Sequence, residues 1–366
     1  MSQWKTRILA LSILLWLVPP VWADDAEPAS ASSLPANQWS LLSHHLEFLA
    51  MDGINQFRYV DNNPGDVTTR DDYYKLSTTV RVKLIGEGTT YLQARGESGR
   101  SFTASYDYTG IGLHDGYWSF NVKSLFIGQK IGSHWEAQAG GIEYDRGAGT
   151  EATYADNDAW LEGYRLRYAP PAFSKAMPDL ISATIGYVGD FKQPNAFARL
   201  PHMGDENYIQ ILGRKQFGAT RDLSAEFDSL QSVRYTREAL HLQQLPLVAV
   251  DELIGETLTR ASDNASFGWS GSLFRTLDRK KRVRVGGFIS DMPKGIFLKD
   301  NETIFMNGDS YVLGERIGPT LRLIPVKNFE VALFGSSRLD SSSTPRYRGQ
   351  MTVTYHFADL FNRGLR

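Results

Sequence analysis

The chain has 366 residues, no cysteine and a formal net charge of −2. The absence of cysteine excludes disulfides, thiolate metal sites, cysteine nucleophiles and lipid attachment at an N-terminal cysteine, and the near-neutral charge gives no electrostatic case for a nucleic-acid partner. Aromatic residues make up 12% of the chain and mean hydropathy is slightly negative, which is less apolar than a helical membrane protein and typical of a barrel with one lipid-facing and one wet face.

The first residues have the pattern of a secretory signal peptide. Lys5 and Arg7 precede a short apolar run, and Ala23 ends a small-residue cleavage site. The run is too short to cross a membrane as a helix, which needs roughly 20 apolar residues. We therefore expect a signal peptide at residues 1–23, followed by a flexible periplasmic lead-in at 24–44 that is rich in Asp, Ala, Ser and Pro.

From residue 45 to residue 357, polar and apolar side chains alternate in long segments. The first clear case is segment 75–84. Lys75, Arg81 and Lys83 belong to its polar series of every second residue, and Leu76 begins the other, mostly apolar series. The same alternation recurs in segments 164–168, 181–187, 282–289 and 348–357. Because successive side chains of a strand point to opposite faces, each segment predicts a strand with one polar and one apolar face.

Two observations favour a transmembrane barrel over a soluble β-sandwich. The segments are longer than the 5 to 6 residues usual for sandwich strands and match the roughly 9 to 11 residues of a tilted membrane strand. The connections also alternate in length: short ones are predicted at 86–88, 131–133, 217–220, 276–281 and 325–327, and long ones at 61–72, 98–116, 145–159, 191–206 and 291–309. This is typical of barrels with short periplasmic turns and long external loops.

The pattern therefore predicts an all-β fold: a single transmembrane antiparallel β-barrel of about 16 strands over residues 45–357, with about 14 or 18 strands as alternatives, and a C-terminal tail at 358–366. The uncertainty in the count lies in stretch 217–264. Strands are expected near 221–229, 232–243 and 247–258, although the periodicity of Glu238–Leu242 and Asp251–Leu258 also fits helix.

The last strand carries a family resemblance. The sequence Met351-Thr-Val353-Thr-Tyr355-His-Phe357 resembles the terminal strand of the outer-membrane porin superfamily, although residues 358–366 follow it. Three further segments, 126–130, 141–146 and 161–168, resemble alginate-export-type porins. The resemblance implies residence in the bacterial outer membrane, assembly by the barrel-assembly machinery, and diffusion or polysaccharide passage through a charged lumen.

If the apolar face meets lipid, the polar face lines the lumen, since an Arg or Lys facing lipid at the bilayer midplane costs about 2–4 kcal/mol. The predicted pore-lining residues are Lys75, Arg81, Lys83, Arg165, Arg167, Arg214, Arg282, Arg284, Arg322 and Arg348, with the acidic Glu136 and Glu330. Most acidic residues are expected instead in the loops and the lead-in. Basic rings of this kind predict passage of small anionic solutes. The alternative is an arginine ladder neutralised by carboxylates of loops folded inward, such as Asp145 or Asp156.

Other functions have weaker sequence support. An exporter of an anionic, alginate-like polysaccharide would use the same basic lumen in the opposite direction. A barrel enzyme or an adhesin-like binding protein is a further alternative, but we find no nucleophile elbow or zinc motif. We favour no catalytic or metal site at the pairs His114-Asp115 and His44-His45 or at the acidic runs 156–158 and 300–302. No cofactor is expected. The expected partners are outer-membrane lipid, hydrophilic solutes and the assembly machinery; the oligomeric state is left open.

Overall fold

The computed structural model describes residues 45–61, 69–85, 88–100, 120–150, 152–153, 160–170, 177–188, 195–245, 250–262, 265–293, 295–296, 313–341 and 346–358. The predicted signal peptide, the lead-in and most of the C-terminal tail lie outside these residues. The chain divides into two compact units, Met1–Trp39 and Ser40–Arg366, and the second unit holds every element described below.

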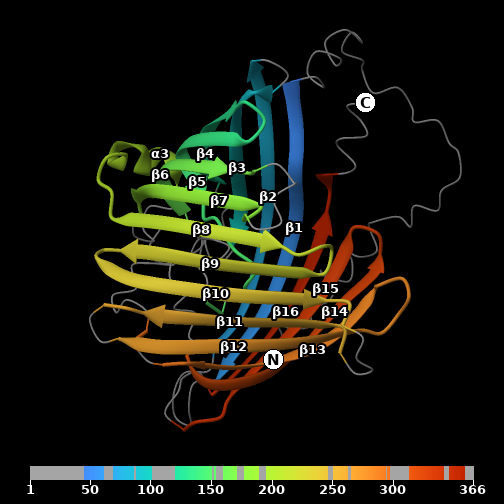
Figure 1. Cartoon of the computed structure of the whole chain (residues 1–366). Helices are drawn as coiled ribbons and strands as arrows, with labels where there is room; N and C mark the ends of the chain where they lie inside the picture. Colours follow the sequence, from blue (N-terminus) through green and yellow to red (C-terminus); the bar gives the residue numbers. More distant parts are fainter. Residues whose placement is uncertain are drawn as a thin grey trace, which may run out of the picture. The chain divides into compact units, whose positions relative to one another are not determined.

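The second unit is a closed antiparallel barrel of sixteen strands, each hydrogen-bonded to its neighbours in the sequence (Figure 1). The strands are β1 (Leu46–Asp61), β2 (Thr69–Ile85), β3 (Thr90–Arg100), β4 (Phe120–Ile131), β5 (Trp135–Glu143), β6 (Trp160–Tyr168), β7 (Leu180–Tyr187), β8 (Tyr208–Gln216), β9 (Arg221–Leu230), β10 (Val233–Gln243), β11 (Glu252–Arg260), β12 (Ser266–Thr276), β13 (Val283–Met292), β14 (Gly314–Val326), β15 (Phe329–Arg338) and β16 (Tyr347–His356). β1 pairs with both β2 and β16, which closes the barrel. The predicted fold class and the count of sixteen are confirmed.

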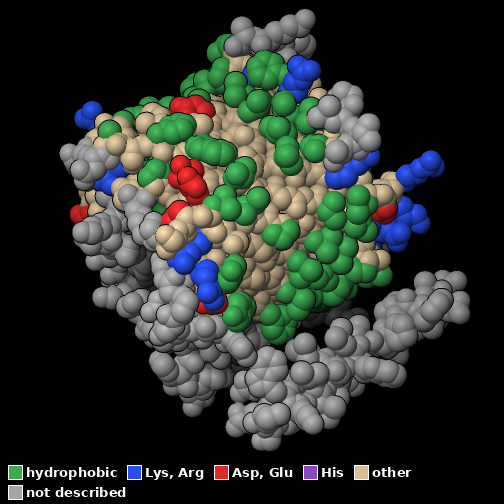
Figure 2. Space-filling view, turned by 90° about the horizontal axis from the view of Figure 1, so that it is seen from below, with side chains coloured by type: hydrophobic (Ala, Val, Ile, Leu, Met, Phe, Trp, Pro, Cys, Tyr) green, Lys and Arg blue, Asp and Glu red, His purple; other side chains and the backbone are tan. Residues whose placement is uncertain are grey.

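Burial along the strands is the reverse of that in a soluble protein. In β9, the apolar Leu223 and Phe227 are exposed, whereas Asp228, which directly follows Phe227, is fully buried. Figure 2 shows one face of the molecule, where hydrophobic side chains gather and charged ones are few in the middle. Apolar side chains therefore cover the outside, and the polar series of each strand forms what we call the inner face.

Two short turns at one end of the barrel use glycine at positive φ. Gly132, between β4 and β5, has φ +62, and Gly218, between β8 and β9, has φ +69. The backbone at these positions is in the left-handed region, which glycine enters without a Cβ penalty. The chain can thus reverse direction between two consecutive strands within a few residues.

The predicted alternation of short and long connections holds only in part. β9 and β10 are joined by Gln231 and Ser232 alone, at the end where long loops were expected; both have positive φ, as in the tight turns of hairpins. At the opposite end, β6 and β7 are separated by residues 169–179 rather than by a tight turn. The predicted long loop 61–72 is also shorter than expected, because Asp61 and residues 69–72 belong to strands.

The stretch that left the count open holds three strands, and none of its described residues is helical. β9, β10 and β11 occupy the three predicted places, with β11 starting at Glu252 rather than near 247, and the helical alternative for Glu238–Leu242 and Asp251–Leu258 is wrong. Pairing of β10 with both neighbours, residue for residue, holds these segments extended despite their helix-like periodicity. No helix within the described ranges is long and apolar enough to cross a membrane.

Candidate functional site

The predicted lumen residues lie on strands with one exception. They are Lys75, Arg81 and Lys83 on β2, Glu136 on β5, Arg165 and Arg167 on β6, Arg214 on β8, Arg284 on β13, Arg322 on β14, Glu330 on β15 and Arg348 on β16. Each alternates with outward apolar residues and so faces the interior. Arg282 instead precedes β13, and its Nε lies 3.3 Å from the Asp278 carboxylate of the turn. That these residues line an open path stays a prediction.

Five of these cations have a carboxylate partner on another strand of the barrel. The pairs are Lys75–Glu97 (3.5 Å), Arg167–Glu136 (3.9 Å), Arg284–Glu252 (2.6 Å), Arg322–Glu330 (2.6 Å) and Arg214–Asp222. Arg81 differs: it donates to the Gln93 amide oxygen at 2.8 Å and lies over the Tyr91 ring at 4.2 Å. Arg348 likewise donates to the Gln350 amide oxygen at 3.0 Å. Hydrogen bonds to neutral amides leave the positive charge of the arginine in place.

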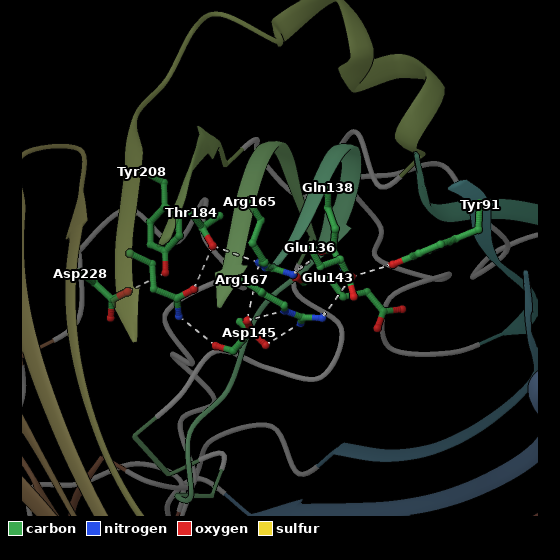
Figure 3. Close-up of polar contacts among 11 residues, drawn as sticks. Tyr91, Glu136, Gln138, Glu143, Asp145, Arg165, Arg167, Thr184, Tyr208 and Asp228 are labelled. Carbon is green, nitrogen blue, oxygen red and sulfur yellow. Dashed lines mark hydrogen bonds and ion pairs between the residues drawn. The ribbon is translucent and has the colours of Figure 1, made fainter. Parts of the chain in front are cut away.

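The connection after β5 turns into the barrel interior. We call residues 144–150 and 152–153 the lumen loop. Its Asp145 carboxylate accepts two hydrogen bonds from Arg167, at 3.0 and 2.7 Å, and lies 3.7 Å from Nε of Arg165. Gln210 on β8 donates to the backbone oxygen of Asp145 at 2.8 Å. Figure 3 shows Arg165 and Arg167 pointing from β6 toward Asp145.

The far part of the lumen loop is held by β9 and β11. The backbone amide of Ala148 donates to the Ser224 hydroxyl at 2.8 Å. Glu256 accepts from the Thr150 amide at 2.8 Å and from the Thr153 hydroxyl at 2.6 Å. The lumen loop therefore crosses the inner face from β6 to β11 and occupies one side of the interior.

A buried charge cluster lies beneath the lumen loop. The Arg237 guanidinium on β10 lies 2.7 Å from Glu226 and also contacts Asp228, both on β9, and all three side chains are fully buried. Arg237 also donates to the backbone oxygen of Thr153, and the Tyr144 hydroxyl donates to Glu226. One guanidinium thus holds two carboxylates and fixes both ends of the lumen loop.

The sequence predicts that inward acidic residues are fewer than basic ones and places Glu97 among them, near a strand end. The buried inner-face carboxylates Asp222, Glu226, Asp228 and Glu256 were not predicted. The signal was present: in segment 222–228, acidic and serine residues alternate with apolar ones.

A row of glycines lies where the lumen loop leaves the wall. Gly140, Gly163 and Gly186 are paired across β5, β6 and β7. A Cβ at Gly163 would lie 2.3 Å from the Ile185 oxygen, and one at Gly186 would lie 2.4 Å from the Glu162 oxygen. The strand backbones approach too closely here for any larger residue. The row carries no side chain, which leaves the interior free at the point where the chain turns inward.

A short helix supports the same strands from outside. Helix α3 (Ala196–Arg199), followed by the 3-10 turn η3 (Leu200–His202), contacts β4 and β5 (Figure 1). Arg199 is fully buried and donates to the backbone oxygen of Lys123 at 2.8 Å, beside a β-bulge of β4. The outward Glu162 of β6 is fully buried next to it. The helix thereby covers an acidic side chain on the outer face of the barrel.

The residues that could suggest other chemistry do not gather into a site. Among the residues with described placement, no three His, Asp or Glu side chains converge as metal ligands. His114, and the acidic runs 156–158 and 300–302, lie outside the described residues. Of the histidines on the inner face, His241 contacts Glu252 and His356 contacts Asp52, in separate pairs.

The attachment of the lumen loop predicts a defined pH dependence. Burial alone would raise the pKa of the Asp145 carboxyl, but the charges of Arg165 and Arg167 and the Arg167 hydrogen bond lower it below its usual value. A lowered pKa means that the stabilisation is complete above the unfolded pKa, about 3.9, and is lost as the pH falls through the folded value. We expect steady single-channel current from pH 7 to 5 and added current noise only in stronger acid.

The Asp145→Asn variant is the control for this pH dependence. It removes the charge at all pH values, so it should show at pH 7 the noise that the native chain shows only in acid. A native chain that turns noisy near neutral pH, with D145N unchanged, would exclude Asp145 as the pH-sensitive attachment.

Comparison with known proteins shows which solved structures share the fold of this chain. No protein-family model matches the chain, and no curated protein matches its sequence. Solved structures do match: a variant of a Rh. blastica porin has a TM-score of 0.55 at 10% identity, covering 85% of this chain and 100% of that chain. A Salmonella typhi OmpF structure, in complex with daunomycin, has a TM-score of 0.53 at 12% identity, covering 86% and 98%.

At such low identity the likeness establishes a porin-like β-barrel fold and goes no further. The broad resemblance seen in the last strand is confirmed at the level of the fold. The narrower resemblance to alginate-export-type porins stays a prediction.

Proposed function

We propose that the chain forms a channel in the bacterial outer membrane for the passive diffusion of small hydrophilic solutes, with a preference for anions. One observation carries the proposal: a closed sixteen-stranded barrel has apolar side chains outside, polar side chains inside, and a loop folded across part of the interior. A barrel of this size encloses an aqueous channel rather than a packed core. The lumen loop narrows that channel.

The preference for anions follows from how charge is divided around the inner face. Glu226 and Asp228 of β9 and Glu256 of β11 lie under the lumen loop, where Arg237 and loop donors hold them. Arg81 on β2 donates to the neutral amide oxygen of Gln93 instead. Two walls of the interior thus differ in sign, and the basic wall lies away from the loop. Field lines from such a wall favour anions in a low-dielectric passage.

Placement in the membrane and partners are part of the same proposal. Phe357, just after β16, donates its amide to the Met51 oxygen at 2.6 Å and packs against Tyr355 at 4.4 Å between ring centroids. The closing strand therefore ends on an ordered aromatic residue, as expected for a strand read by the barrel-assembly machinery. Lipid and solutes are the other proposed partners.

A salt gradient across a planar bilayer tests both parts. We expect stepwise conductance and a reversal potential of the sign given by anion preference. The double variant Arg81→Gln with Lys83→Gln should move the reversal potential toward zero, because it removes charge from the basic wall. Arg279→Gln, in the exposed turn after β12, is the matched control and should leave it unchanged.

Cation preference in the native chain would overturn the proposed selectivity, and a folded protein without conductance would overturn the channel. Export of an anionic polysaccharide makes a different prediction: the polymer itself should block the current from the periplasmic side. Enzymatic turnover of lipid or peptide without conductance would favour the barrel-enzyme alternative.

A further inference from the structure

Two phenylalanine rings stack on the inner face, opposite the apolar outside. Phe288 on β13 and Phe334 on β15 have ring centroids 5.4 Å apart and an interplanar angle of 9°. Their sequence neighbours Ile289 and Leu333 are exposed on the outside, so the rings point inward. Both rings are half-buried. Apolar rings on a wall of polar side chains need an explanation.

The stack crosses the intervening strand at a glycine. Phe288 is paired with Gly318 of β14, and Phe334 is paired with Thr320 of the same strand. A Cβ at Gly318 would lie 2.6 Å from Cε1 of Phe288. Rings from strands that are not neighbours can meet only because Gly318 has no side chain between them.

An amide and two arginines lie near Phe334 in the sheet register. Phe334 lies opposite Gln350, which lies opposite Arg58 of β1. Arg322 is a diagonal neighbour of Phe334, at a separation of roughly 7–8 Å expected for such pairs. The Arg322 side chain is 47% exposed, and one of its nitrogens binds Glu330 at 2.6 Å. A guanidinium has five N–H donors, so it can bind a carboxylate and a second anion together.

The same wall shows that a guanidinium and a ring coexist in contact here. Arg284 lies over the Phe274 ring at 3.8 Å. Phe274 is paired with Gly286, and a Cβ there would lie 2.3 Å from the ring. The Phe274 ring lies on this wall because it covers the backbone of Gly286. Such covering does not explain why two rings should stack over β14 with cations beside them.

We propose that Phe288 and Phe334, with Arg322 and Arg58, form a transient binding subsite in the lumen for aromatic carboxylates. The inference rests on the proposed channel function and names the solute class. A flat apolar face stacks on the rings, as aromatic pairs do, while the carboxylate meets a guanidinium. Inorganic anions lack the apolar face, and aromatic cations are repelled by the arginines. Only a solute with both features gains from both parts of the wall.

The test measures how benzoate and acetate affect the chloride current through single channels. We expect benzoate to reduce the current at a concentration roughly 2- to 10-fold lower than acetate does, which is the range that one aromatic contact provides. Phe334→Ala should remove this difference. Phe334→Leu keeps an apolar side chain without a ring and should also remove it, which covers the case in which the alanine variant folds poorly.

The matched control is Phe227→Ala on the outside of β9, which should retain the difference between benzoate and acetate. A native channel with anion-preferring conductance but equal effects of benzoate and acetate would overturn the subsite and leave the channel standing. A difference that survives in both Phe334 variants would also overturn it. Absence of any conductance would overturn the proposed function itself.

Discussion

Replacing Arg237 by methionine is expected to destabilise the barrel by about 3–5 kcal/mol, the usual cost of removing one partner from a buried ion pair. The side chain is fully buried against Glu226 and Asp228, and methionine fills a similar space without charge. Two carboxylates would then remain inside with no cation. The free energy of unfolding, from urea titration of the refolded barrel in detergent, measures the loss.

Two control variants separate charge from packing. Arg234→Met lies on the same strand, but its side chain is exposed, so its effect should stay within about 0.5 kcal/mol. Adding Glu226→Gln and Asp228→Asn to the Arg237→Met variant should restore most of the stability, because neutral side chains do not need the guanidinium. Equal stability losses in R234M and R237M would show that the cluster does not hold the fold.

Excision of the lumen loop should enlarge the conductance and weaken the anion preference. Replacing residues 146–158 by a short Gly-Ser linker removes residues 146–150 and 152–153 of the lumen loop, through which the loop reaches β9 and β11. It also removes the donors Thr150 and Thr153 from Glu256, which would then face the passage as a negative charge. The single-channel step and the reversal potential measure the two effects in one experiment.

The matched control for this excision shortens a connection that does not enter the interior. Residues 278–281, in the exposed turn between β12 and β13, serve this purpose. Their replacement should leave both the step and the reversal potential unchanged. An unchanged step after excision of 146–158 would show that the lumen loop does not limit the current.

The barrel could be predicted because its rule is local. From Asp222 to Phe227 of β9, each polar residue is followed by an apolar one, and the pleat of a strand alone puts them on opposite faces. The same rule holds for segments 75–84 and 348–357, so the sixteen strands and their inner faces follow from the order of side chains. Arg282 shows where the rule stops: alternation continues past the strand's end, and the Asp278 carboxylate captures the side chain in the turn.

The lumen loop could not be predicted, because its contacts join distant parts of the chain. Ala148 binds Ser224, which is 76 residues away, and Thr150 binds Glu256, which is 106 residues away. No periodicity records such pairs. Asp145 was among the loop carboxylates considered as partners for inner arginines, but which loop turns inward is decided by the glycine row and by acceptors on β9 and β11. Helix α3 has four residues, too few for a helical period.

The most direct test of an aqueous passage narrowed by the lumen loop is polymer exclusion. Polyethylene glycols of increasing size are added to both sides of a planar bilayer, and the largest polymer that still lowers the conductance is recorded for the native chain and for the chain lacking residues 146–158. We expect both proteins to conduct, with a larger size limit after excision. Equal limits, or a folded native protein that conducts nothing, would contradict the account.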